Sequence, residues 1–257
     1  MPEAVSSSSF EGKVAFITGG ARGFGLAFAT ALAQHGAAVV LADVDRDAAQ
    51  VSAERLVAKG HRALAVECDV SDPDATAAAV AATVDAFGGV DHLINNAGLH
   101  LTRYNLPFTQ QPLGDIRRLF DVNVIGVVNC TLAVRPSMVE RGGGTVLSIS
   151  SMASFGSRSP YGVSKLAVRG LTMAFASELA ADNIRVNAVA PGLIATESAT
   201  ADLDPAFVAG IVDDVQLVHR LGQERDIVEA MLYLCSDRSS FVTGVTLPVT
   251  GGALLAI

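Results

Sequence analysis

The stretch Lys13-Val-Ala-Phe-Ile-Thr-Gly-Gly-Ala-Arg-Gly-Phe-Gly25 joins a short apolar run to a turn that contains four glycines. The apolar run at 13–18 is typical of a buried strand, and the Ala/Leu-rich residues after the turn repeat with a helical period. Glycine suits such a turn because a Cβ would hold a phosphate away from the backbone N–H groups at the start of the helix. The stretch therefore predicts a strand, turn and helix that bind the pyrophosphate of a dinucleotide.

The same alternation of short apolar runs and longer helical segments continues along the chain. Several runs are apolar on both alternating faces, which indicates strands covered by helices on both sides of a sheet. The sequence therefore predicts a doubly wound α/β (Rossmann) fold with an open sheet of about seven parallel strands. The expected strands are 13–18, 38–43, 62–68, 91–95, 144–150, 184–190 and 245–249, and the expected helices are 23–35, 46–59, 73–87, 113–139, 161–181 and 224–236.

The chain of 257 residues shows neither an internal repeat nor a linker. We expect a flexible tail at 1–10 and one dinucleotide-binding catalytic domain at 11–257. The irregular segment of about 191–222 follows the end of an expected strand, where α/β folds place substrate loops.

Composition excludes several classes of partner. Eighteen basic and 26 acidic residues give a net charge of −8, which disfavours nucleic acid and anionic membrane surfaces. No uninterrupted run reaches about 18 apolar residues, so no membrane span is expected. The N-terminus lacks the features of an export signal, which predicts a cytoplasmic protein. The three cysteines are widely spaced, which predicts neither disulfides nor a metal site.

Asp43 ends the second expected strand, 18 residues after Gly25. A carboxylate at this interval accepts a hydrogen bond from the 2′-hydroxyl of an adenosine ribose and repels a 2′-phosphate. Arg22, beside the phosphate turn, is the one residue that would favour a 2′-phosphate. We weight Asp43 more, so the sequence predicts NAD as cofactor, with NADP second.

Tyr161 and Lys165 lie four residues apart at the start of an expected helix and therefore share a face. A free tyrosine titrates near pH 10, and a nearby ammonium group favours the phenolate. The pair therefore predicts an acid/base catalyst for an alcohol or a carbonyl group.

With these motifs in order, the sequence resembles the short-chain dehydrogenase/reductase family over nearly the whole chain after the tail. The matching stations are Thr18-Gly19-xxx-Gly23-x-Gly25, Asp69-Val70, Asn95-Asn96-Ala97-Gly98, Asn123, Ser151, Tyr161-xxx-Lys165 and Pro191-Gly192 with Thr196 beyond.

The resemblance implies a catalytic tetrad. Tyr161 would be the acid/base and Ser151 would orient the substrate oxygen. Lys165 would lower the tyrosine pKa and bond the nicotinamide ribose, and Asn123 would hold a water that relays protons. Asp69 would contact the adenine amine, and Asn95 would support the sheet or the cofactor. The cofactor-binding residues are then expected to be Gly19, Arg22, Gly23, Phe24, Gly25, Asp43, Asp69, Val70, Asn95, Ala97, Tyr161, Lys165, Pro191, Gly192, Ile194 and Thr196.

The serine of the tetrad stays open. The interval from Ser151 to Tyr161 is about three residues shorter than the family resemblance implies, so Ser150 or Ser148 could take its place. Period-two alternation places Ser148 and Ser150 on one face of the strand and Ser151 on the other.

Together these features predict an NAD-dependent oxidoreductase that interconverts a secondary alcohol and a ketone. The apolar composition of 191–222 favours a small, apolar, non-phosphorylated substrate. The alternatives are a non-catalytic NAD-binding regulator, and an epimerase or dehydratase with retained NAD. By resemblance, the helices at 113–139 and 161–181 and the last strand would form the interface of a homodimer or homotetramer.

Overall fold

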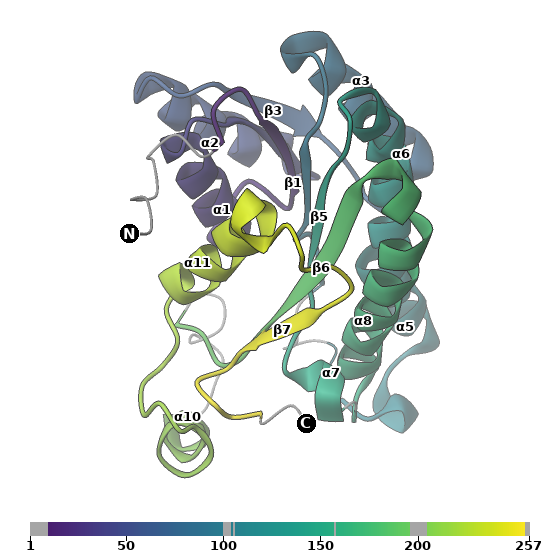
Figure 1. Ribbon diagram of the computed structural model, residues 1–257. Coiled ribbons are helices and arrows are strands. Elements are labelled where there is room, and N and C mark those ends of the chain that lie inside the picture. The colour runs from purple at the N-terminus through teal and green to yellow at the C-terminus, as the bar shows by residue number, and fades with distance from the viewer. Residues whose placement is uncertain (1–9, 100–103, 105, 157, 196–204, 255–257) are drawn as a thin grey trace.

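Seven short apolar segments form one parallel sheet in the computed structural model (Figure 1). The strand order is β3-β2-β1-β4-β5-β6-β7, which confirms the predicted doubly wound fold. The structure describes residues 10–99, 104, 106–156, 158–195 and 205–254. The strands are β1 Val14–Thr18, β2 Ala38–Asp43, β3 Ala63–Glu67, β4 His92–Asn95, β5 Gly144–Ile149, β6 Ile184–Pro191 and β7 Thr246–Val249.

Helices cover both faces of the sheet (Figure 1). One face carries α1 (Gly23–Gln34), α2 (Arg46–Ala58) and α11 (Glu224–Cys235). The opposite face carries α3 (Pro73–Phe87), α6 (Gly126–Glu140) and α8 (Pro160–Glu178). Short elements complete the described chain: α5 (Leu113–Phe120), α7 (Ala153–Gly156), α10 (Pro205–Gly210) and the single turns η1 (Phe108–Gln110), η2 (Asp121–Ile125), η3 (Ala180–Asp182), η4 (Ile211–Val215) and η5 (Asp237–Ser239).

Alternating residues of the strands supply two separate cores. Ala15 and Ile17 of β1 pack toward α1 and α11, whereas Val14 and Phe16 pack toward the α3, α6 and α8 layer. Every residue of β1 is therefore buried, as a sheet covered on both sides requires.

The parallel strands give the sheet two different edges. All strands end at one edge, called here the carboxyl edge, and begin at the other, called the amino edge. From β1 the chain adds β2 and β3 on one side of the sheet, and then crosses back to add β4 on the other side of β1. The strand order therefore reverses between β1 and β4. Ligands of open α/β sheets bind at such a reversal.

Two sequence expectations need correction. Phe10, which we assigned to the flexible tail, is 2% exposed and packs edge-on against the rings of His35 and His92. Residues 1–9 lie outside the described residues. The expected helix at 113–139 is interrupted by the π turn η2, because the backbone there bonds to the fifth residue on rather than the fourth.

The run Leu113–Glu140 also departs from the expectation that no segment suits a membrane. By length and composition alone its 28 residues, with a mean hydropathy of 1.4, could cross one. In the fold this run packs against α3, α8, β4 and β5. It therefore supplies apolar side chains to the core on that face of the sheet.

Candidate active site

The glycine turn lies at the reversal point, between the end of β1 and the start of α1. Gly19 and Gly23 have φ angles of +62° and +53°, a region in which other residues are strained. A Cβ on Gly23 would meet no atom within 4 Å, so the outer side of this turn is open. The turn therefore offers an uncovered cradle at a helix N-terminus, which fits a pyrophosphate.

Two residues that the sequence analysis named without assigning them a role hold this turn in place. The Asn96 side chain donates hydrogen bonds to the carbonyl oxygens of Thr18 (2.9 Å) and Gly19 (3.0 Å). The Thr18 hydroxyl accepts from the backbone N–H groups of Asn96 and Ala97, at 3.0 Å each. The doubled Asn95-Asn96 was the signal, because neighbouring residues at a strand end point in different directions.

Asn95, expected to support the sheet or the cofactor, lies inside the sheet region. Its Nδ2 is 3.4 Å from the Ser148 hydroxyl and 3.5 Å from the Thr131 hydroxyl. Its Oδ1 is buried and has no hydrogen-bond partner among the described residues. The placement favours the supporting role within the sheet.

Asp43 lies beside the glycine turn. Its two carboxylate oxygens accept from the backbone N–H groups of Ala21 and Asp45, both at 3.0 Å. Asp45 caps α2 through the Ala48 N–H (3.1 Å), and its second oxygen pairs with Arg22. Arg22 is thus directed to Asp45, across an ion pair whose side chains are largely exposed.

The other residues expected near the adenosine show mixed placements. One Asp69 oxygen accepts from both the N–H (2.9 Å) and the hydroxyl (2.6 Å) of Ser71. Val70 is 7% exposed and packs in the core, and the ring of Phe24 stacks on Phe28 with centroids 6.0 Å apart. Any contact of Val70 or Phe24 with a cofactor remains a prediction.

Tyr161 and Lys165 lie at the start of α8, where Ser159 caps the helix and Pro160 is its first residue. The Lys165 Nζ donates to the Ile149 carbonyl oxygen (2.8 Å) and lies 5.9 Å from the centre of the Tyr161 ring. Burial lowers the pKa of Lys165 to about 8. The ammonium group is therefore held in the interior by a main-chain carbonyl of β5.

The structure distinguishes the three candidate serines. Ser148 is buried beside Asn95, and the Ser150 hydroxyl donates to the Lys165 carbonyl oxygen (2.9 Å). The side chain of Ser151 is the one that interacts with Tyr161, where it acts to lower the tyrosine pKa. Of the three, Ser151 is therefore the serine placed against the tyrosine.

Burial raises the pKa of Tyr161 above its ordinary value, although the interaction with Ser151 acts in the opposite direction. We expected Lys165 to lower this pKa, and with the side chains as they lie the net direction is upward. Burial of the phenol outweighs the effect of Ser151, and the Lys165 ammonium group donates to the Ile149 carbonyl oxygen.

Asn123 occupies the π turn η2 and is 1% exposed. Its side-chain Oδ1 accepts from Leu99 N–H (2.7 Å), and its Nδ2 donates to Leu99 O (3.3 Å) and Ser164 Oγ (3.2 Å). A Cβ on Gly98 would lie 3.3 Å from the Asn123 Oδ1 and 3.4 Å from the Lys165 Nζ. The missing side chain at Gly98 thus lets these two groups approach the same space.

The segment after β6 continues this edge. The Pro191 carbonyl accepts from Met152 N–H (2.9 Å), and Gly192 N–H donates to the Val249 carbonyl (2.9 Å). Ile194 is 5% exposed and forms a bridge with Gly222. Thr196 lies outside the described residues.

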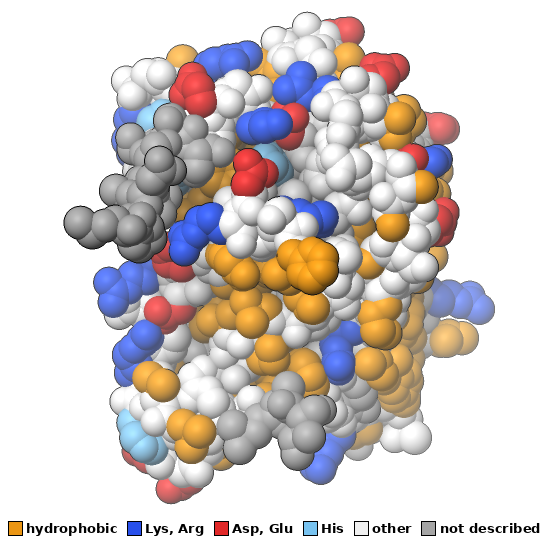
Figure 2. All heavy atoms as spheres, in the orientation of Figure 1, with side chains coloured by type: hydrophobic (Ala, Val, Ile, Leu, Met, Phe, Trp, Pro, Cys, Tyr) orange, Lys and Arg blue, Asp and Glu red, His pale blue; other side chains and the backbone are white. Residues whose placement is uncertain are grey.

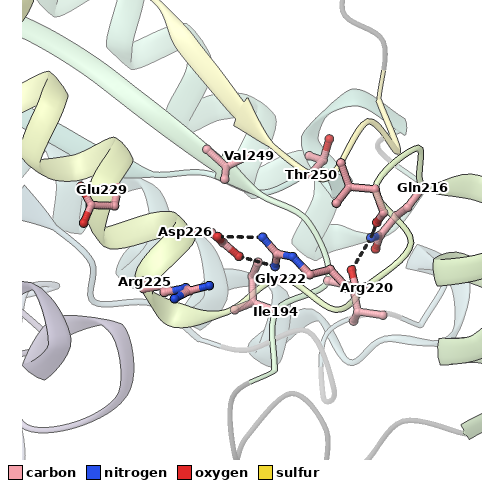
Figure 3. Close-up of a pocket in the computed structure, with 12 residues that line it drawn as sticks. Ile194, Gln216, Arg220, Gly222, Arg225, Asp226, Glu229, Val249 and Thr250 are labelled. Atoms are coloured by element: carbon pink, nitrogen blue, oxygen red, sulfur yellow. Dashed lines mark hydrogen bonds and ion pairs between the residues drawn. The ribbon is translucent and has the colours of Figure 1, made fainter.

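A pocket of about 570 Å³ opens beyond Ile194, between α11 and the end of β7 (Figure 3). The Arg220–Asp226 ion pair, with contacts of 2.7 and 3.0 Å, lies on its wall. Neither Ser151 nor Tyr161 lines this pocket, so it is separate from the tetrad residues. Within the described ranges, no three His, Cys, Asp or Glu side chains form a group that could hold a metal ion.

Comparison with known proteins identifies the family. A family model described as enoyl-(acyl carrier protein) reductase matches residues 19–253. The 7alpha-hydroxysteroid dehydrogenase of Escherichia coli is 35% identical over 247 residues, which cover 95% of each chain. The chain belongs to the short-chain dehydrogenase/reductase family.

Other members are similar over comparable lengths. An uncharacterized oxidoreductase of Mycobacterium tuberculosis is 43% identical over 248 residues, which cover 96% of this chain and 99% of that protein. A solved 7 alpha-hydroxysteroid dehydrogenase, complexed with NADH and 7-oxo glycochenodeoxycholic acid, matches with a TM-score of 0.89. It is 34% identical, and the match covers 97% of both chains. This short-chain dehydrogenase/reductase is thus an oxidoreductase that acts on alcohol and ketone groups with a nicotinamide cofactor.

Proposed function

We propose that this enzyme interconverts a secondary alcohol and a ketone, that it prefers NAD, and that Tyr161 is its acid/base. The observation that carries the proposal is the arrangement at the carboxyl edge. Tyr161, which interacts with Ser151, and the buried Lys165 lie on the same edge as the open glycine turn. An acid/base group and a dinucleotide cradle at one edge are what hydride transfer to or from a carbon–oxygen bond requires.

The residues around the glycine turn would hold the cofactor. The open side of the turn at Gly23 would take the pyrophosphate, and Asp43 would take the adenosine ribose. Asp43 supports NAD because its charge repels a 2′-phosphate, and Arg22 is already paired with Asp45. When bound, the nicotinamide ring supplies the hydride donor or acceptor.

Tyr161 carries its proton at neutral pH, since a tyrosine ordinarily titrates near pH 10 and burial raises its pKa further. It is therefore ready to donate that proton to a ketone oxygen, while the Ser151 hydroxyl orients the same oxygen. Alcohol oxidation needs the phenolate, so its rate should rise with pH. Lys165 remains protonated below about pH 8, and Asn123, which shares the space beside Gly98, positions this part of the site.

An apolar substrate is supported by the relatives rather than by a described pocket. The 7alpha- and 3alpha-hydroxysteroid dehydrogenases, at 35% and 38% identity, act on hydroxyl groups of steroids by their names. We therefore place hydroxysteroids first among the candidate substrates.

The test is the formation of reduced cofactor on a panel of secondary alcohols that includes steroid, aryl, cyclic and sugar-like compounds. Each alcohol is tested with NAD and NADP, for the wild type and Tyr161→Phe. We expect NAD-dependent turnover that the variant loses. Binding of NAD without turnover would support a regulator instead, and product formation without net cofactor reduction would support an epimerase or dehydratase.

We also propose self-association, through apolar side chains left on two surfaces. Leu132 of α6 and Met173 of α8 are 51% and 62% exposed. Apolar side chains also gather on the face that carries α11 and β7 (Figures 1 and 2). Phe241, which lies between η5 and β7 in the chain, is fully exposed. Light scattering on the protein as it elutes from a size-exclusion column measures its oligomeric state, and a monomer would contradict the proposal.

A further inference from the structure

Arg169 lies on α8, two turns after Tyr161 and one turn after Lys165, on the same face of the helix. Its guanidinium carbon lies 3.8 Å from the ring centre of Phe155, and its Nη1 donates to the Ser154 carbonyl oxygen (3.3 Å). Its Nε is buried without a hydrogen-bond partner, and no carboxylate within the described part of the chain forms an ion pair with it. The contacts of this cation are thus directed to one short segment, 154–155.

That segment belongs to the turn that starts at Ser151. The Ser151 hydroxyl accepts from Ala153 N–H (3.1 Å), and its carbonyl accepts from Ser154 N–H (3.0 Å). Phe155 N–H in turn donates to the Met152 carbonyl (3.1 Å). Since each of these bonds closes over three or four residues, a displacement of Phe155 displaces Ser151.

We propose that Arg169 is a positioning residue of the active site: by clamping Phe155 and the Ser154 carbonyl, it fixes the turn that holds the Ser151 hydroxyl against Tyr161. The proposal rests on the proposed function only for its kinetic consequence. The structural part concerns the placement of the Ser151 turn beside Tyr161.

If Arg169 only stabilised the fold, replacing it would lower stability without a specific effect on Tyr161. The chain offers a matched pair for that comparison. Arg62 lies over the ring of Phe87 at 5.0 Å, at the amino edge, far along the chain from the tetrad. Both pairs combine a guanidinium with a phenyl ring, so both substitutions should reduce stability by a similar, modest amount.

The test uses tyrosine labelled with carbon-13 at the ring carbon that bears the hydroxyl. The chain contains three tyrosines, so the Tyr161 resonance is assigned by its absence in Tyr161→Phe. Ser151→Ala provides the resonance position without the serine hydroxyl. We expect Arg169→Ala to shift the Tyr161 resonance in the direction of Ser151→Ala, Arg169→Lys to shift it less, and Arg62→Ala to leave it in place.

Kinetics give the second readout. We expect Arg169→Ala to lower kcat about tenfold, as the weakening of one hydrogen bond in the transition state would, with little change in the dissociation constant of NADH. If Arg169→Ala behaves like Arg62→Ala in both readouts, the proposal is wrong. If the wild type shows no Tyr161-dependent turnover, the proposed function fails, but the resonance shift still decides the role of Arg169.

Discussion

The two edges of the sheet use buried polar residues in opposite ways. At the amino edge, Asp91 is 3% exposed and receives the Val14 N–H (2.8 Å), Arg141 (2.8 Å) and Lys13 (3.4 Å). Burial alone would raise the pKa of Asp91, but the bonds from Arg141 and Val14 and the two cations hold it below its ordinary value. The charge of Asp91 is therefore stabilised by the fold.

At the carboxyl edge the fold disfavours charge on Lys165 and Tyr161. Burial lowers the pKa of Lys165 to about 8 and raises that of Tyr161, and no carboxylate in the described chain pairs with Lys165. Asp91 at the amino edge thus stabilises the protein, whereas the buried ammonium group of Lys165 at the carboxyl edge reduces its stability. We therefore expect substitution of Asp91 to change mainly stability and substitution of Lys165 to change mainly activity.

The largest effect is expected for Lys165→Met. Turnover should fall by about two orders of magnitude or more, because the cation beside the acid/base group is lost. The free energy of unfolding at pH 7 should rise by about 1 kcal/mol, because folding no longer desolvates an ammonium group.

The pH dependence fixes the sign of this prediction. The unfolded lysine has a pKa near 10.4, above the folded value of about 8, so the unfolded chain holds the proton more tightly. This term opposes folding below pH 8 and disappears as the pH rises from 8 to 10.4. Urea unfolding of the wild type and Lys165→Met at pH 7 and pH 10 measures this term. Lys59→Met, at an exposed position, is the control. If Lys165→Met is less stable than the wild type at pH 7, the proposed contrast between the two edges is wrong.

Asp91→Ala should have the reverse outcome. The substitution leaves Arg141 and the Val14 N–H without their buried partner, which should lower the free energy of unfolding by about 3 kcal/mol. The kcat/KM of the folded enzyme should change less than twofold or so, because Asp91 lies at the edge away from the tetrad. Asp182→Ala, which breaks the more exposed pair with Arg135, is the control and should change stability by less than about 1 kcal/mol.

Asp43→Ser tests cofactor choice within the carboxyl edge. The kcat/KM with NAD should fall about tenfold or more relative to that with NADP, because a charged hydrogen-bond acceptor is lost and the repulsion of a 2′-phosphate ends. Adding Asp45→Ala should raise binding of adenosine 2′,5′-bisphosphate further, since Arg22 then loses its partner. Calorimetric titration measures this, and a gain that persists after Arg22→Ala would argue against the role of Arg22.

The smallest expected effect concerns His92. Burial lowers its pKa to about 4, so the unfolded chain takes up a proton first as the pH falls below 6.5. Stability linked to His92 is therefore lost between pH 6.5 and pH 4, by about 1 to 2 kcal/mol at pH 5. His92→Gln should remove that part of the acid sensitivity, and equal losses from pH 7 to pH 5 in both proteins would refute it.

Much of the fold was predictable because its signals repeat. The apolar runs and helical periods located the described strands and the main helices, and the glycine turn with Asp43 lies at the edge where we propose that the nucleotide binds. What the sequence could not give depends on single side-chain directions. The sequence favoured Ser151 but left Ser148 and Ser150 open, and the bracing role of Asn96 was not expected; both depend on where one hydroxyl or amide points after the turns are closed. The contribution of Thr196 stays a prediction.

The π turn at Asp121–Ile125 bears on how this protein could change by evolution or design. A π turn carries one residue more than the α-helix on either side, so deletion of a single residue there would leave one continuous helix. Such a deletion preserves the packing of α6 while it withdraws Asn123 from Leu99 and Ser164. Loss of one codon, rather than replacement of a catalytic side chain, is thus a short route from this enzyme to a folded relative with an altered active site.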